Sequence, residues 1–179
     1  MQRKLKRGFT LIELMVVMTI MGLLITVGIA SYRSTQAKSR DNRRKSDLRQ
    51  IASALELYYN DKGKYPDDDN AGGIKGCGVA ATEVCTWGSI MQDTTKGTVY
   101  MVILPNDSVS GKNYYYDTGA KGFQLYARLE NSQDIDLARE PGAGKAYTLT
   151  DCGGGTLCNY GVASTNLMTT DNTHVAVDE

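Results

Sequence analysis

The sequence has little of the chemistry that builds catalytic sites. Its 179 residues include one histidine, His174, which lies in a polar C-terminal stretch. No G-x-S-x-G, H-E-x-x-H, P-loop or dinucleotide-binding fingerprint is present. Because no nucleophile–base pair or metal-ligand constellation can be assembled from what remains, we expect a protein with no catalytic residues that is not an enzyme.

Metal-binding patterns are incomplete. The four cysteines have C-x7-C and C-x5-C spacings and lack the C-x2-C pairs of common zinc sites. The run Asp67-Asp68-Asp69-Asn70 is similar to the start of a calcium loop, but Ala71 takes a ligand position and no glutamate closes the loop. We therefore expect no metal and no cofactor, calcium being an option that the loop motifs do not support. Gly153-Gly154-Gly155 opens no apolar helix, so it predicts a turn and not a phosphate site.

Proline is absent before Pro66, and only Gly22 and Gly28 weaken the helical pattern between Phe9 and residue 59. Over residues 9–30 the only charge is Glu13, and a run of this length suits a hydrocarbon core about 30 Å thick. Residues 31–60 continue as an amphipathic helix with one apolar stripe. That stripe consists of Leu48, Ile51, Ala52, Leu55, Tyr58 and Tyr59.

Charge is unevenly distributed although the formal net charge is zero. Between Arg33 and Arg49, seven basic residues stand against two acidic ones, whereas nine basic and seventeen acidic residues follow residue 50. The basic cluster can attract DNA or lipid phosphates nonspecifically at most. A solvated helix face, or pairing with the acidic head of a neighbouring copy, is the favoured interpretation. The cluster consists of Arg40, Arg43, Arg44, Lys45 and Arg49.

The C-terminal part, residues 61–179, predicts a small globular head. After a loop of about thirty residues, the apolar period changes to two, which predicts strands over 98–104, 113–117, 123–129 and 159–164. In the third of these, Phe123, Leu125, Ala127 and Leu129 would face the helix, and Gln124, Tyr126 and Arg128 the other side. A helix followed by an antiparallel sheet gives an α+β fold.

The cysteines form an even set, as expected in an oxidising compartment. Three pairings are open to Cys77, Cys85, Cys152 and Cys158. We favour the local pairs Cys77–Cys85 and Cys152–Cys158, since each pair brackets a glycine-bearing loop.

The junction Arg7-Gly8-Phe9-Thr10-Leu11-Ile12-Glu13 carries the most specific signal. A basic leader, residues 1–8, ends in a small residue that precedes the apolar run, whereas secretory signals are cut after theirs. This pattern resembles the class III leader of type IV pilins and of type II secretion pseudopilins. Residues 57–66 similarly resemble the helix exit of pilins and major pseudopilins.

The resemblance implies a residue-specific maturation. A prepilin peptidase would cut after Gly8 and methylate the new N-terminus at Phe9. Glu13 would then pair with the Phe9 amine of a neighbouring copy, because a buried acidic side chain in an apolar helix is costly. A carboxyl that snorkels or stays protonated is the alternative for Glu13.

The resemblance also implies a place and partners. The chain would cross the inner membrane once, over residues 9–30, with its head outside the cytoplasm. It would contact lipid, an inner-membrane assembly platform and then copies of itself, in an extracellular pilus or a periplasmic pseudopilus.

Two filament functions compete, and a third function needs no filament. The helix exit favours a major pseudopilin, but no D-P-W-G stretch or C-terminal calcium loop is present, and the cysteines near the C-terminus favour a type IV pilin. We therefore favour the pilin. A signal-anchored binding protein that does not polymerise is the third option.

Overall fold

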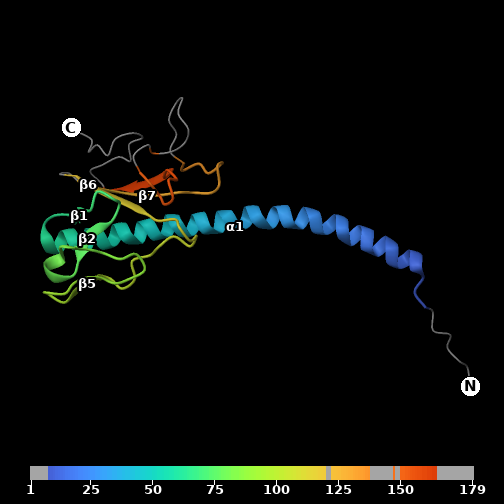
Figure 1. Ribbon diagram of the computed structural model, residues 1–179, viewed down its shortest axis with the longest axis horizontal. Coiled ribbons are helices and arrows are strands. Elements are labelled where there is room, and N and C mark those ends of the chain that lie inside the picture. The colour runs from blue at the N-terminus through green and yellow to red at the C-terminus, as the bar shows by residue number, and fades with distance from the viewer. Residues whose placement is uncertain (1–7, 120–121, 138–146, 148–149, 165–179) are drawn as a thin grey trace, which may run out of the picture. The chain divides into compact units, whose positions relative to one another are not determined.

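The computed structural model describes residues 8–119, 122–137, 147 and 150–164, and side chains within this part except those of 27–31 (Figure 1). The chain divides into two compact units, Met1–Ser39 and Arg40–Glu179. The first holds the start of the long helix. The second holds the end of that helix together with every strand.

One helix, α1 (Leu11–Lys62), forms the N-terminal part of the described chain and is 52 residues long. It passes through Gly22 and Gly28 without a break, as the absence of proline predicts. It ends where Gly63 adopts a φ of +74° and its N–H donates to the carbonyl of Tyr59 at 2.7 Å. A glycine in this left-handed conformation is a common helix terminus. The predicted boundaries of 9–60 are therefore two residues early at each end.

The described residues of the head form three small antiparallel sheets. The first has the order β1 (Asp67–Asp68), β2 (Ile74–Cys77), β3 (Glu83–Val84), with a 3-10 turn at Val79–Ala81. The second pairs β4 (Met91–Asp93) with β5 (Thr98–Met101). The third has the order β6 (Tyr115–Gly119), β7 (Gly122–Ala127), β8 (Tyr160–Ala163). The α+β fold expected from the sequence is confirmed.

The region after Pro66 differs from the prediction of a plain loop. Strands β1 to β4 fall inside it, and β5 ends at Met101 and not at 104. These strands are two to four residues long, too short for an alternating pattern to emerge. The hairpin and the last strand were predicted within a few residues of β6, β7 and β8.

The main core lies between the end of α1 and the sheets. Leu48, Ile51, Leu55 and Tyr58 are buried from the helix side. They meet Ile74, Met91, Leu104, Tyr116, Phe123 and Leu125. The apolar stripe of the helix was predicted correctly except at Tyr59, which is 43% exposed. Its ring packs instead against Tyr65, with centroids 4.7 Å apart.

Strand β7 is buried on both faces, which corrects the prediction of one polar face. Every residue of Gly122–Ala127 is buried. On the side away from the helix, Tyr126 packs with Tyr147 and the Cys152–Cys158 pair in a second small core. The C-terminal cysteine loop therefore covers the face of Gln124 and Tyr126, which the sequence places on the side away from the helix.

Candidate functional site

The N-terminal junction is organised around Thr10 and Glu13. The Thr10 N–H and hydroxyl both donate to Glu13 Oε2, at 2.9 and 2.7 Å, and the Glu13 N–H donates to Thr10 Oγ1 at 3.3 Å. This reciprocal pattern is a capping box, with the threonine before the first helical residue and the glutamate at the third. Gly8 and Phe9 lie directly before it, outside α1. The candidate cleavage point therefore precedes a helix that has its own cap.

Sequence reasoning missed this cap although the signal was present. Thr10-Leu11-Ile12-Glu13 fits the T-x-x-E form of the motif. The sequence analysis predicts a Glu13 carboxylate that pairs with a neighbouring amine, or a carboxyl that snorkels or stays protonated; capping of its own helix is a further role. The Glu13 carboxylate thus caps its own helix, and any role in assembly is additional to this capping.

The helix that follows presents apolar side chains to its surroundings. From Phe9 to Ile25, the large hydrophobic side chains are between 41% exposed, at Val17, and 82% exposed, at Phe9. The sequence predicts a membrane crossing over 9–30. In the part of the chain that the structure describes, no helical segment has both the length and the apolar character that a bilayer crossing requires.

The predicted basic cluster is not a uniform solvated face. Arg44 is buried and donates to Asp107 twice, at 2.6 and 2.9 Å, and to Asp41 and Glu130 at 2.8 and 2.9 Å. Burial alone lowers the pKa of Arg44, but the hydrogen bonds and charge of Asp107, followed by those of Glu130 and Asp41, raise it overall. The carboxylates of the head neutralise the charge of Arg44, and the buried guanidinium cannot contact phosphates.

Two further members of the cluster are paired within the head as well. Arg40 binds Glu130 at 2.8 and 2.5 Å, and Lys45 binds Asp134 and Asp136 at 2.6 and 2.7 Å. Arg43 and Arg49 remain exposed. The cluster therefore ties α1 to the segments around Asp107 and residues 130–136. We call Arg40, Asp41, Arg44, Asp107 and Glu130 the charged network.

Both local disulfides are formed. Cys77 and Cys85 are joined across the first sheet, and Cys152 and Cys158 across the C-terminal loop. Asp151 accepts the N–H groups of Gly153 and Gly155, at 2.8 and 3.2 Å, so the glycine run is a turn inside that loop. Asn113 donates its N–H to the Cys152 carbonyl at 3.0 Å, which fixes the loop to the start of the β6 segment.

The comparisons with known proteins point to one family. The prokaryotic N-terminal methylation motif matches residues 3–29. The type II secretion system core protein G of Pseudomonas aeruginosa is 31% identical over 128 residues, covering 71% of this chain and 85% of that protein. The chain belongs to the type IV pilin and type II secretion pseudopilin family.

Type IV pilins are similar to this family member over a shorter stretch. The major pilin PilA of Myxococcus xanthus is 38% identical over 64 residues, 36% of this chain and 29% of that pilin. The major pilin PilE1 of Neisseria gonorrhoeae is 34% identical over 70 residues, which is 39% of this chain and 42% of that pilin. The chain thus spans less than half the length of these pilins. No solved structure gives a significant match.

Metal-binding side chains are not gathered in the described part of this pilin-family chain. Within it, no group of three or more histidine, cysteine or acidic residues could hold an ion. Asp68 and Asp69, part of the calcium-like run, accept backbone N–H groups of Asn70, Ala71 and Gly73 at 2.7 to 2.8 Å. These aspartates therefore shape a turn. His174 lies outside the described residues.

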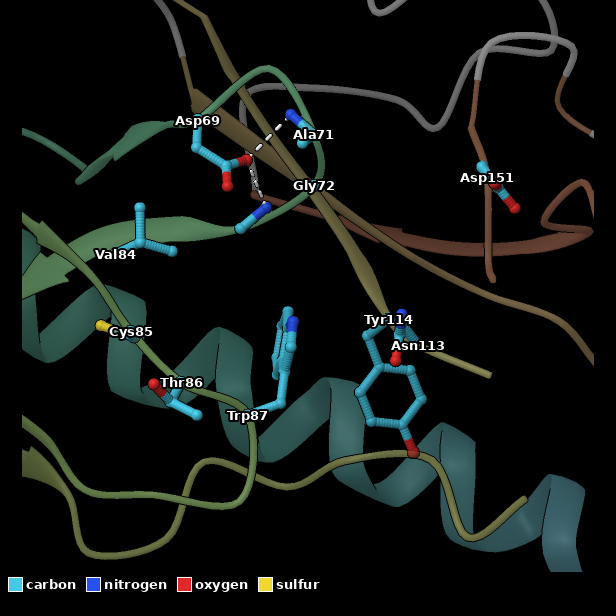
Figure 2. Close-up of a pocket in the computed structure, with 11 residues that line it drawn as sticks. Asp69, Ala71, Gly72, Val84, Cys85, Thr86, Trp87, Asn113, Tyr114 and Asp151 are labelled. Carbon is cyan, nitrogen blue, oxygen red and sulfur yellow. Dashed lines mark hydrogen bonds between the residues drawn. The ribbon is translucent and has the colours of Figure 1, made fainter. Parts of the chain in front are cut away.

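The head of this pilin-family chain also contains a pocket of about 400 Å³. Figure 2 shows the side chain of Trp87 rising into it from the segment after β3, between Cys85 and Tyr114. Asp69 lines it from the turn between β1 and β2, and Asp151 from the C-terminal loop. Nothing in the sequence marked this pocket, because its walls come from segments 69–73, 84–87, 113–114 and 151.

Proposed function

We propose that the mature chain is the structural subunit of a type IV pilus-like filament and performs no catalysis. The observation that carries this proposal is the exposed apolar surface of α1, from Leu11 to Ile25, in a chain whose first residues match the methylation motif. An apolar surface of this kind must be covered by lipid or by other apolar helices. The helices of neighbouring copies, packed together in a filament core, would cover it.

Cleavage after Gly8 fits this packing on physical grounds. The leader carries four basic residues, Arg3, Lys4, Lys6 and Arg7, which would be costly to bury in a filament core. Removing them also creates an α-amine at Phe9, and methylation leaves that nitrogen basic. Glu13 of the next copy would balance its charge. We therefore assign cleavage and methylation to a prepilin peptidase acting at Gly8 and Phe9.

The proposed location follows from the same chemistry. Before assembly, residues 9–30 would be held in the inner membrane, with the head on the outer side and an assembly platform drawing subunits from the lipid. The two disulfides support an oxidising location for the head, because such bonds are rare in the cytosol.

A second candidate is the major pseudopilin of a type II secretion system. It is favoured by the core protein G relative, whose similarity reaches over 128 residues and thus into the head. The C-terminal disulfide loop of Cys152–Cys158, resembling the disulfide-closed region of pilins, favours the pilus.

Mass spectrometry of the N-terminus tests both candidates on native cells. Membranes and filaments sheared from the cell surface are analysed separately. A chain beginning at N-methylated Phe9 in the sheared fraction is the expected result. The same species confined to membranes would favour the pseudopilin. An intact N-terminus at Met1 in every fraction would contradict a filament and favour the signal-anchored binding protein.

A further inference from the structure

The pocket beside Trp87 has an acidic and aromatic lining. Its polar walls include the carboxylates of Asp69 and Asp151, and none of its lining residues, all of which the structure describes, is a lysine, arginine or histidine. Such a lining disfavours an anion and favours a positively charged group. The volume of about 400 Å³ lies in the range of small-ligand sites.

Trp87 offers a π-surface to this pocket. It is half-buried, and its ring meets that of Tyr114 edge to face, with centroids 5.9 Å apart and planes at 81°. The Tyr114 hydroxyl donates to buried Asp47 at 2.7 Å, so the supporting ring is held in place. The Trp87 indole forms no hydrogen bond with any residue that the structure describes. A positioned indole face is the best aromatic partner for a cation.

Asp69 has one oxygen engaged and one available. Its Oδ1 accepts the N–H groups of Ala71 and Gly73, at 2.8 and 2.7 Å, while Oδ2 accepts no hydrogen bond from a described residue. Figure 2 shows Oδ1 fastened to the turn by both bonds. Asp69 and Asp151 also form no ion pair within the described part of the chain. Both oxygens of Asp151 accept backbone N–H groups of its own loop, so Asp69 Oδ2 is the acceptor available to a ligand.

The walls of the pocket are held rigidly. Cys85 belongs to one disulfide, and Asp151 is next to the other. A Cβ added at Gly72 would lie 2.5 Å from the Tyr115 ring, so the turn that carries Asp69 sits close to β6. A site organised in advance loses little entropy when it binds.

We infer that this pocket binds an alkylammonium group, placed over the Trp87 indole and neutralised by Asp69. The inference does not depend on filament formation, since all the residues that carry it lie in one head. A lysine side chain of a protein is the favoured source, because its ammonium can donate a hydrogen bond to Asp69 Oδ2 and a choline-type headgroup has no N–H to donate.

Fluorescence gives a direct test because Trp87 is the only tryptophan in the chain. The full chain, kept in a polyoxyethylene detergent that carries no charge and no sugar, is titrated at constant ionic strength with choline and with Nα-acetyl-lysine methylamide. We expect a saturable change in Trp87 emission with at least one of them. The tighter of the two identifies the source of the cation. Absence of a saturable response to both would overturn the inference.

Matched controls separate charge from shape. The probe 3,3-dimethylbutan-1-ol has the shape of choline without its charge, and glucose is a neutral sugar. If either neutral probe changes the Trp87 emission as much as the cation does, the inference is overturned.

Two variants of the protein test the role of Asp69. Asp69→Asn keeps an acceptor for the turn and removes the charge, so it should weaken cation binding about tenfold. Asp67→Asn makes the same change of net charge at an exposed carboxylate outside the pocket and should leave binding unchanged. Equal weakening in both variants would mean that overall charge, not the pocket, controls the response.

Discussion

Arg44 and Asp107 form a two-pronged ion pair inside the head, with Nε to Oδ2 at 2.6 Å and Nη2 to Oδ1 at 2.9 Å. Their side chains are only 2% and 1% exposed. Asp41 completes the arrangement from the helix, and it also accepts the N–H groups of Glu130 and Asn131 at 2.8 to 3.1 Å. Helix α1 therefore holds two distant segments of the head. Arg44 donates to the segment at Asp107, and Asp41 accepts from the segment at Glu130 and Asn131.

Removing Arg44 should be far more damaging than removing its exposed neighbour. Arg44→Met leaves the buried carboxylates of Asp41 and Asp107 without their cation, so we expect a loss of about 3–5 kcal/mol of unfolding free energy. Arg43→Met is the matched control: the Arg43 side chain is 67% exposed, and the loss should be below about 1 kcal/mol. Denaturation of the full chain in nonionic detergent, followed by Trp87 emission, measures both. Equal losses would contradict a structural role for the charged network.

Acid should weaken the same network through Glu130. The hydrogen bond from Arg40 is the largest cause that lowers the pKa of Glu130, to about 2; burial opposes it and Arg44 adds to it. An unfolded glutamate titrates near ~4.3, so the folded chain binds fewer protons between the two values. The stability that Glu130 contributes is thus complete above pH ~4.3 and is lost as the pH falls through about 2.

Comparison with Glu130→Gln isolates this contribution. At neutral pH the variant should be less stable by about 1–2 kcal/mol, a figure discounted for solvent screening at a side chain that is 32% exposed. The difference should close as the pH falls from ~4.3 to about 2. Denaturation midpoints at a series of pH values measure it, with Glu83→Gln as the control for loss of one carboxylate. A difference that stays constant over this range would contradict the assignment.

Secondary-structure elements can be predicted from the sequence because their signal lies in neighbouring residues. Contacts between residues that are far apart in the sequence cannot be predicted in this way. Helix α1 was predicted because an apolar stripe recurs through Leu48, Ile51 and Leu55 and no proline interrupts it. Arg44 was predicted, as part of a basic cluster, to lie on a solvated face or to pair with the acidic head of a neighbouring copy. Its acceptors Asp107 and Glu130 lie 63 and 86 residues away, and no periodicity reports such a pairing.

The same distinction applies to the candidate sites. The junction at Gly8, Phe9 and Glu13 was identified because the order of charge, glycine and apolar run is written in consecutive residues. The pocket beside Trp87 was not, because its walls come from four separated segments. The buried outer face of β7 was missed for a similar reason: Tyr126 is covered by the Cys152–Cys158 loop.

Gly153 should tolerate a side chain less well than the glycine after it. A Cβ at Gly153 would lie 2.2 Å from the Gly111 carbonyl oxygen, and its φ is +99°. Gly154 has a φ of +65° and open space around it. We expect Gly154→Ala to cost about 1 kcal/mol from backbone strain and Gly153→Ala to cost about 2–4 kcal/mol. Thermal unfolding of the two variants measures the difference. Equal losses of stability in the two variants would mean that the backbone moves easily enough to relieve the clash between the new Cβ and the Gly111 carbonyl.

Peptide mapping should find each disulfide within a single tryptic peptide. Cleavage after Lys75 and Lys96 leaves Cys77 and Cys85 together, and cleavage after Lys145 leaves Cys152 and Cys158 together. Without reduction, each peptide should be lighter by two hydrogens than the same peptide after reduction. A peptide linking Cys77 to Cys152 would contradict the local pairing. Alkylation of free thiols before digestion controls for exchange between the pairs.

Glu13 is the residue at which capping and assembly have to be separated. Glu13→Gln can still accept the two hydrogen bonds from Thr10, so the helix cap is retained while the negative charge is lost. Thr10→Ala removes the hydroxyl that donates to Glu13 and accepts from its N–H, but keeps the charge. Loss of a threonine cap costs about 0.5–2 kcal/mol of helix stability.

If Glu13 pairs with the Phe9 amine of the next subunit, charge and not capping must decide assembly. Glu13→Gln should then be cut after Gly8 as usual, yet the amount of subunit in sheared filaments should fall about tenfold or more, since a buried amine is left unpaired. Thr10→Ala should assemble close to normally, because a filament can offset a weakened cap. Quantitative immunoblots of sheared and membrane fractions measure the ratio. Equal losses in the two variants would mean that the cap accounts for the glutamate, and that no pairing between subunits is needed to explain it.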